Sequence, residues 1–111
     1  MSYCVLITDR ARHDIENAAD YIEFSLKNPI AADNLLSEFK KAALSLAEMP
    51  ERYSLVDDVV LASWGIRCFN VKNYILFYRI DKEEKAVTVL RFLYGRSSWR
   101  SILRTHNSKN T

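Results

Sequence analysis

Ala86-Val-Thr-Val-Leu-Arg-Phe-Leu-Tyr94 is the stretch that decides the fold, and Gly95-Arg-Ser-Ser-Trp-Arg100 follows it directly. Its nine residues are dense in β-branched and aromatic side chains and carry one charge, Arg91, which predicts a largely buried central strand. A guanidinium stays charged in a protein, so burying it without a partner is costly. We therefore expect Arg91 either to face an open cleft or to pair with a carboxylate. The candidate partners on the first predicted helix are Glu16, Asp20 and Glu23.

Two more arginines and a tryptophan follow the end of this strand. The strand ends at Gly95, and Arg96, Trp99 and Arg100 come within the next five residues. Cations beside an aromatic ring at the end of a rigid strand suit an anionic or aromatic ligand. A structural role is the alternative: the two arginines then belong to a solvated turn, and Trp99 packs partly on the core.

Length and composition fit one domain. The chain has 111 residues, of which 49% are hydrophobic, enough for one core. Sixteen basic residues against 14 acidic ones give a net charge of +2, too weak to imply nucleic-acid binding over the whole surface. The basic residues gather after Trp64, so the molecule has a basic end. We predict a single domain over residues 1–111, with a flexible tail over about 104–111.

The remaining elements are arranged around the central strand. Residues 3–8 form a short β-type run, and apolar spacing predicts helices over 11–26 and 29–49, the second capped by Asn28 before Pro29. Two further strands are predicted over 66–71 and 74–80. The fold is therefore α+β, in the order β-α-α-β-β-β, with an antiparallel sheet and an N-terminal helical hairpin packed on one face.

Two parts of this fold stay open. Residues 51–63 have a weak pattern, which we interpret as a loop with at most a short edge strand. An antiparallel sheet can leave its second face to solvent, where Arg91 would not be buried. Strict alternation, however, places Arg91 on the same side as Val87, Val89 and Leu93.

The sequence favours an intracellular protein without bound groups. No apolar run approaches the ~20 residues that span a bilayer, and the N-terminus lacks the features of a secretion signal, so we expect a cytoplasmic protein without a membrane partner. Cys4 and Cys68 are far apart and lie in apolar settings, which favours reduced core thiols. No metal or cofactor is expected, because the usual ligands are few and scattered.

Several short motifs in this order resemble the RelE/ParE superfamily of bacterial toxins, and most closely its ParE-like members. They are Ala-Asp-Tyr-Ile in the first helix, Gly-Ile-Arg before the sheet, Ile-Leu-Phe-Tyr-Arg-Ile, and the ending Val-Leu-Arg-Phe-Leu-Tyr-Gly-Arg-Ser-Ser-Trp-Arg. The resemblance covers residues 3 to about 103. It implies the toxin of a type II toxin-antitoxin, or plasmid stabilisation, module that inhibits growth and is neutralised by a small antitoxin. It leaves open a homodimer or a toxin-antitoxin hetero-oligomer.

RelE-type members of the superfamily cut messenger RNA on the ribosome without a metal, a reaction that needs a base, an acid and cations around the phosphate. Those enzymes have an arginine where this chain has Ile75, and a tyrosine or a His-Tyr pair near the place of Leu103. His13 lies in a helix and His106 in the tail, which suits neither to act as a base. As a ribonuclease, the chain would use Arg67, Arg91, Tyr94 and Arg96, with Tyr74 or Tyr78 as a further proton-transfer group.

ParE-type members instead resemble the chain in its Gly-Arg and Trp-Arg ending, and they poison DNA gyrase. That activity needs a binding surface, for which arginine and tryptophan are favoured residues. We therefore interpret Arg91, Arg96, Trp99 and Arg100 as target-binding residues of a gyrase inhibitor that is not an enzyme. The alternatives are the ribosome-dependent messenger RNA endoribonuclease, or mRNA interferase, and an inactive homologue that acts only through protein association.

Overall fold

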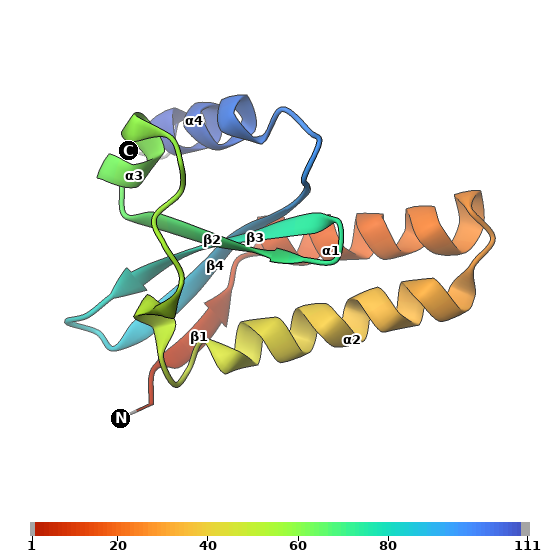
Figure 1. The fold of residues 1–111 in the computed structure, drawn as a ribbon, viewed down its shortest axis with the longest axis horizontal. Helices are drawn as coiled ribbons and strands as arrows, with labels where there is room; N and C mark the ends of the chain where they lie inside the picture. The colour runs from red at the N-terminus through yellow and green to blue at the C-terminus, as the bar shows by residue number, and fades with distance from the viewer. Residues whose placement is uncertain (1, 110–111) are drawn as a thin grey trace.

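The predicted central strand is the centre of the observed sheet. In the computed structural model, which describes residues 2–109 and their side chains as far as residue 105, β4 (Ala86–Tyr94) lies between β1 (Cys4–Ile7) and β3 (Tyr74–Asp81). The strand β2 (Ile66–Val71) forms the far edge, so the strand order is β1-β4-β3-β2 (Figure 1).

The sheet is mixed. β3 is antiparallel to both β2 and β4, as the short turns between them require, but β1 pairs in parallel with the first half of β4. The prediction of an antiparallel sheet therefore holds for three strands and is wrong for β1. No tight turn joins β1 to β4, so connectivity does not impose an antiparallel arrangement on this pair.

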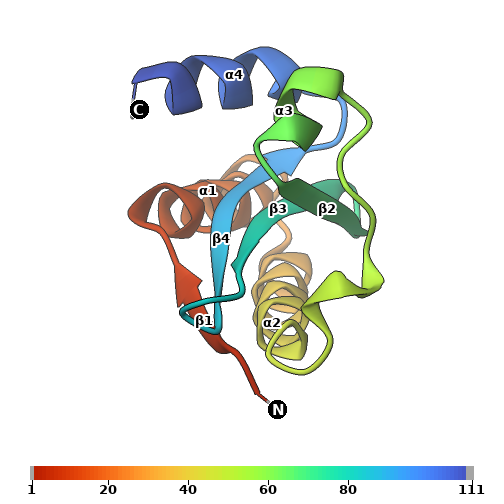
Figure 2. The same ribbon diagram turned by 90° about the vertical axis from the view of Figure 1, so that its left-hand side faces the viewer.

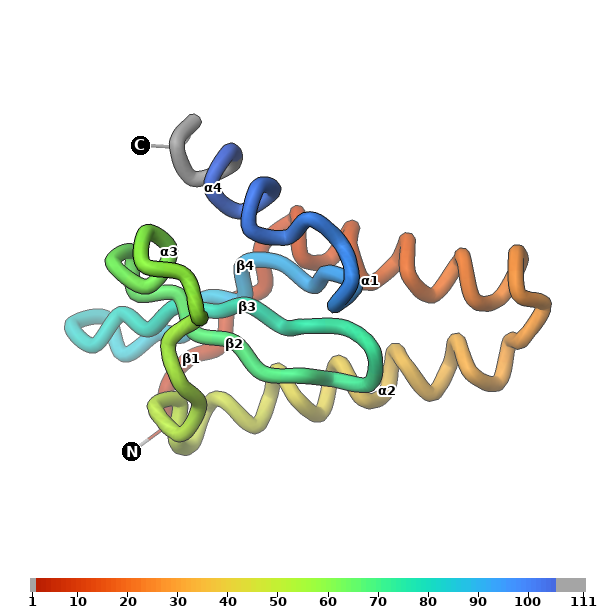
Figure 3. Tube along the Cα trace, turned by 45° about the horizontal axis from the view of Figure 1, so that its top comes forward, coloured from red at the N-terminus to blue at the C-terminus, as the bar shows by residue number. Residues whose placement is uncertain are grey.

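The predicted helical hairpin is confirmed. α1 (Asp9–Asp20) continues as a π-helical turn, η1 (Tyr21–Ser25), and α2 (Pro29–Ser45) returns beside it (Figures 1 and 3). The Asn28 side chain accepts a hydrogen bond of 3.1 Å from the Ala31 N–H, which caps α2 as predicted. The hairpin extends past the end of the sheet in both views.

The other face of the sheet is also covered. Residues 50–63 contain a 3-10 turn, η2 (Pro50–Arg52), and a short helix, α3 (Val59–Ser63), while α4 (Trp99–Lys109) follows β4. Both helices lie over the face opposite the hairpin (Figure 2). The expectation of a solvent-exposed second face is therefore wrong where α3 and α4 pack. The flexible tail predicted over about 104–111 is helical as far as Lys109. Residues 110–111 lie outside the described part.

The sheet consequently separates two apolar clusters. The first, between the sheet and the hairpin, includes buried Ile15, Leu35, Phe39, Leu76, Tyr78, Val87, Val89 and Phe92. The second, between the sheet and α3 with α4, consists of buried Val56, Leu61, Ile66, Phe77, Leu93 and Leu103. None of the described helices is long and apolar enough to cross a membrane.

A β-bulge in β4 changes which face its side chains occupy. Phe77 lies opposite Arg91, but the next residue of β3, Tyr78, lies opposite Val89, so Leu90 is the extra residue. Val89 faces the hairpin, whereas Arg91 starts on the opposite face, the one Phe77 shares. Strict alternation places Arg91 on the side of Val87, Val89 and Leu93. This prediction is wrong for Val87 and Val89, because the bulge leaves Arg91 on the face that Leu93 shares with Phe77.

Candidate functional site

Arg91 is held by a carboxylate of α1. Its Nε lies 2.7 Å from Asp14 Oδ2 and its Nη2 lies 2.9 Å from Asp14 Oδ1, a bidentate pair. The side chains of Arg91 and Asp14 are only 14% and 10% exposed. The expectation of a helical carboxylate partner is correct in kind, but the partner is Asp14, not one of the three residues named above. As a consequence, Arg91 does not present a free cation to a ligand.

The edge of β4 explains this pairing. β1 ends at Ile7, opposite Val89, so the last residues of β4 have no strand neighbour on that side. The first turns of α1 lie there instead, and Asp14 Oδ2 also accepts a hydrogen bond of 3.0 Å from the Phe92 N–H. One carboxylate therefore binds the backbone of β4 and its arginine together.

Arg67 also has a structural role. Its Nη1 donates to the Tyr53 carbonyl at 2.6 Å and to the Glu51 carbonyl at 3.5 Å, which ties the segment before α3 to β2. Both of these partners are backbone carbonyls. The Arg67 guanidinium lies on the edge strand β2, away from the end of β4, and is not part of the cluster of residues that follows β4.

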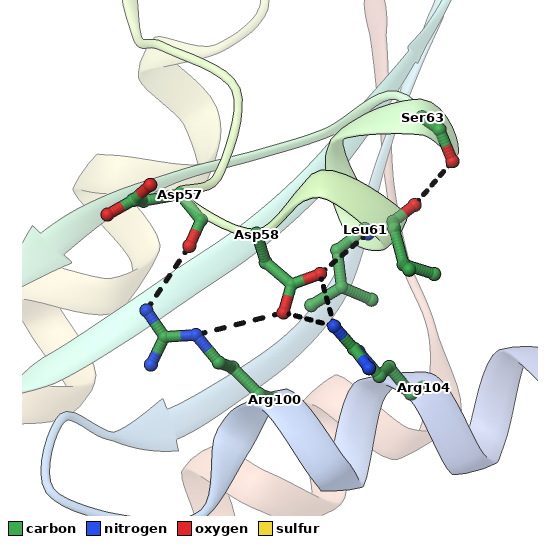
Figure 4. Close-up of polar contacts among 7 residues, drawn as sticks. Asp57, Asp58, Leu61, Ser63, Arg100 and Arg104 are labelled. Carbon is green, nitrogen blue, oxygen red and sulfur yellow. Dashed lines mark hydrogen bonds and ion pairs between the residues drawn. The ribbon is translucent and has the colours of Figure 1, made fainter.

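Arg100 and Trp99 join α4 to the rest of the molecule. The Arg100 guanidinium lies over the Trp99 ring, 4.3 Å from its centre, and the ring packs on Phe77 at 5.2 Å. Arg100 Nη2 also donates to the Asp57 carbonyl at 3.2 Å, as Figure 4 shows. Trp99 is half-buried, so its predicted partial packing on the core is confirmed. Both residues serve the docking of α4.

Asp58 is the anchor of this contact. Its carboxylate, 3% exposed, caps α3 through the Leu61 N–H at 3.0 Å and accepts from Arg104 Nη2 at 2.9 and 3.1 Å (Figure 4). Arg100 Nε lies 3.7 Å away. The Leu61 N–H, with Arg104, lowers the pKa of Asp58 although burial opposes this shift.

Acid is expected to weaken this anchor. Because the folded-state pKa of Asp58 is lowered, its charge stabilises the fold above the unfolded value of about 4, and this contribution is lost as pH falls through the folded value. Asp58→Asn keeps a capping oxygen but has no charge to lose. Urea midpoints should therefore favour the wild type at pH 7, with the gap closing below about pH 4. A gap that stays constant down to pH 3 would contradict the assignment.

Arg96 and Tyr94 are the predicted residues that remain accessible. Arg96 is exposed, and among the described residues it has no hydrogen bond or ion pair. Tyr94 is 46% exposed. Both line an open cleft of about 440 Å³ together with Lys72 and Asn73 of the β2–β3 turn. The sequence analysis did not identify these two turn residues as part of a site. The signal that could have found them is a basic residue, Lys72, in the short turn between two predicted strands.

The other candidate proton-transfer groups differ in their surroundings. Tyr78 is fully buried, and its hydroxyl donates to the Pro50 carbonyl at 2.5 Å. Burial raises the pKa of Tyr78 to about 12, and burial also raises the pKa of Tyr74. His13 is exposed on α1, and the side chain of His106 lies outside the described residues. Burial therefore separates Tyr78 from any ligand, whereas Tyr74 lines a cleft beside Tyr94.

The pKa of Tyr78 leads to an expected pH dependence. The folded chain holds this phenol proton up to about pH 12, whereas the unfolded chain loses it near pH 10, so alkali favours unfolding between those values. Tyr78→Phe leaves the Pro50 carbonyl without its donor and should cost about 1–3 kcal/mol at pH 9. Urea titrations should show this disadvantage shrinking from pH 10 to 12. An unchanged difference would contradict the raised pKa.

The cysteines do not form a site. Both thiols are free; Cys68 is half-buried, with a pKa raised by burial, but Cys4 is exposed on β1. The prediction of two core thiols is therefore wrong for Cys4, because β1 is an edge strand with one uncovered face. Among the side chains that are described, no group of three or more His, Cys, Asp or Glu residues could hold a metal ion.

A four-stranded sheet with an N-terminal helical hairpin and a C-terminal helix is the fold of the RelE/ParE superfamily of toxins. The family model for the ParE toxin of the type II toxin-antitoxin system parDE matches residues 5–99, so the chain belongs to this family. This result confirms the resemblance drawn from the sequence.

Solved structures of toxin-antitoxin systems share the fold. One is a chain of the toxin-antitoxin complex RelBE2 from Mycobacterium tuberculosis, which is 27% identical in sequence. The match covers 85% of the present chain and 99% of the RelBE2 chain, with a TM-score of 0.63. Another is a chain of the chromosomal ParDE system from P. aeruginosa, which is 16% identical. The match covers 84% of the present chain and 96% of the ParDE chain, with a TM-score of 0.66. No curated protein matches the chain.

Proposed function

We propose that this chain inhibits DNA gyrase by binding it, and that a cognate antitoxin neutralises the chain. The observation that supports binding over catalysis is the loss of two candidate catalytic cations to structural contacts. Arg91 is paired with Asp14, and Arg67 donates to backbone carbonyls. Neither guanidinium is free to neutralise a phosphate in a transition state.

The positions that differ from RelE-type enzymes support the same proposal. Leu103 is 1% exposed and belongs to the core, so a proton-transfer group is replaced by a packing residue. Ile75 lines the open cleft without a charge. Tyr94 and Arg96 remain accessible, and they are the reason to keep ribosome-dependent RNA cleavage as the second candidate function.

The surface for gyrase is smaller than the sequence predicts. Of the four proposed target-binding residues, Arg91 is buried in its ion pair, and Arg100 holds α4 against Asp57 and Asp58. Arg96 is the free cation of the set, and Trp99 offers only its half-buried ring. We place the contact surface around Arg96 and the neighbouring Tyr94.

A separate apolar surface suits the antitoxin. Phe24, at the tip of the hairpin, is 68% exposed, and Ile30 and Leu44 on α2 are 74% and 60% exposed. Exposed apolar side chains on a helical pair are typical of a surface that a partner helix covers.

The experiment is a direct comparison of the two targets. The full chain, expressed from an inducible promoter and purified, is assayed for inhibition of gyrase supercoiling and for cleavage of ribosome-bound message. We expect supercoiling to be lost and the message to stay intact. Message cleavage without an effect on gyrase would replace the proposal with the ribonuclease, and no effect in either assay would support the inactive homologue.

A further inference from the structure

Two clefts meet at the end of the sheet and form one groove, which we call the end groove. The first, about 440 Å³, holds Lys72 and Arg96, and the second, about 530 Å³, holds Tyr21 and Tyr74. Tyr94 lines both clefts, so the groove is continuous from α4's side of the sheet to the π-helical turn of the hairpin. Each cleft is in the size range of small-ligand sites.

One half of the end groove is cationic. Lys72 and Arg96 are exposed, and among the described residues neither makes a hydrogen bond or an ion pair. No acidic residue lines either cleft, whereas the amides of Asn70 and Asn73 add hydrogen-bonding groups beside the two cations. Unneutralised cations with neighbouring amides are suited to bind a phosphate.

The backbone keeps this half of the groove in shape. Lys72 has a φ of 58° in the β2–β3 turn, and the Gly95 N–H donates to the Asn73 carbonyl at 2.9 Å. A Cβ at Gly95 would lie 3.2 Å from that carbonyl, a tight contact that would push the turn away from the end of β4. Glycine therefore allows the turn that carries Lys72 to stay close to the segment that carries Arg96.

The other half of the end groove is aromatic. Tyr74 stacks on Phe92, with ring centres 5.1 Å apart and planes 9° apart, so its ring is fixed by the core. Tyr94 meets Tyr74 edge to face at 5.6 Å and is 46% exposed, and Tyr21 is 55% exposed on the π-helical turn. Exposed rings on rigid elements form a surface on which bases can stack.

We propose that the end groove binds a single strand of nucleic acid, with a phosphate at Lys72 and Arg96 and a base against Tyr94. Aromatic rings next to unpaired cations match the alternation of bases and phosphates, and paired bases could not reach the rings. An acidic peptide would use the cations but not the rings. The inference rests on the proposed function only for the origin of the bound strand. If the chain acts on gyrase, the strand comes from the DNA that gyrase cleaves.

The first test measures binding of a fluorescein-labelled dT12 strand to the full chain by anisotropy at several salt concentrations. Arg96→Gln and Lys72→Asn, whose asparagine tolerates the positive φ, should each reduce the slope of log K against log salt by about 0.7. Tyr94→Leu should weaken binding about fivefold or more with the slope unchanged. The exposed control on α2, Lys40→Gln, lies outside both clefts and should behave as wild type.

The inference fails if dT12 does not bind or if the salt slopes of the cation variants are unchanged. It also fails if a twelve-base-pair duplex binds with equal affinity, or if a glutamate-rich peptide binds more tightly and is insensitive to Tyr94→Leu. Circular dichroism of each variant checks that it is folded. A loss of binding in Lys40→Gln as large as in Arg96→Gln would likewise count against a specific groove.

The second test separates the groove from its target. If the wild type inhibits gyrase and Arg96→Gln and Tyr94→Leu inhibit it equally well, the groove inference fails while the proposed function stands. If dT12 binding follows the expected pattern but gyrase is unaffected, the groove stands and the gyrase assignment fails. Message cleavage that requires Arg96 and Tyr94 would keep the groove and make RNA its source.

Discussion

Asp14→Ala is expected to lower the free energy of unfolding by about 3–5 kcal/mol, because it leaves Arg91 as a buried charge without a partner. The same substitution removes the acceptor of the Phe92 N–H at an edge of β4 that has no neighbouring strand. Urea unfolding at pH 7, followed by tryptophan fluorescence, measures the effect.

Two comparisons make this prediction specific. Asp9→Ala removes an exposed carboxylate of α1 that lies 3.0 Å from Arg12, and it should leave the unfolding midpoint nearly unchanged. The double variant Asp14→Leu with Arg91→Met should recover much of the loss, because it removes both buried charges. If Asp14→Ala and Asp9→Ala have equal effects, the pair does not stabilise the end of β4.

Leu103→Ala is expected to lower the free energy of unfolding by about 2–5 kcal/mol. Leu103 is 1% exposed between α4 and the sheet, and truncation leaves a cavity in the smaller of the two apolar clusters. Leu103→Tyr should also destabilise the chain, because a phenol at this place overfills the cluster. Thermal unfolding by circular dichroism measures both variants.

The matched control for this prediction is Leu44→Ala on α2. Leu44 is 60% exposed, so its truncation should change stability by no more than about 0.5 kcal/mol. If Leu103→Ala proves equally mild, α4 does not depend on this side chain for its position. A gain of message cleavage in a folded Leu103→Tyr would show that the site is instead a ribonuclease lacking one group.

The main elements of the fold could be predicted because their apolar spacing is strong. The spacing of Ile15 and Ala18 gives α1, and the density of β-branched residues gives β4. The covering of the second face could not be predicted, since α3 has five residues and depends on Asp58 contacts with Arg104 from 46 residues further on. A short helix of this kind is stabilised by tertiary packing, which local sequence does not reveal.

The site was only partly predictable for a related reason. Tyr94 and Arg96 follow from their place at the end of a strand, and both line the end groove. Arg91 was misplaced because the bulge at Leu90 shifts the alternation by one residue, and nothing in the residue types marks a bulge there. Asp14 was missed because its pairing depends on β1 ending at Ile7.

That early end of β1 bears on how chains of this protein meet one another. An unpaired strand edge is a template on which a second copy could add its own strand and start a polymer. Beyond Val89, however, the Asp14 carboxylate of α1 accepts the β4 backbone hydrogen bond that a neighbouring strand would otherwise accept. A second copy that added a strand here would have to displace Asp14 and leave Arg91 without its counter-charge. Asp14 thus blocks strand addition along the last residues of β4, and on this side of the sheet only the outer edge of β1 remains for it.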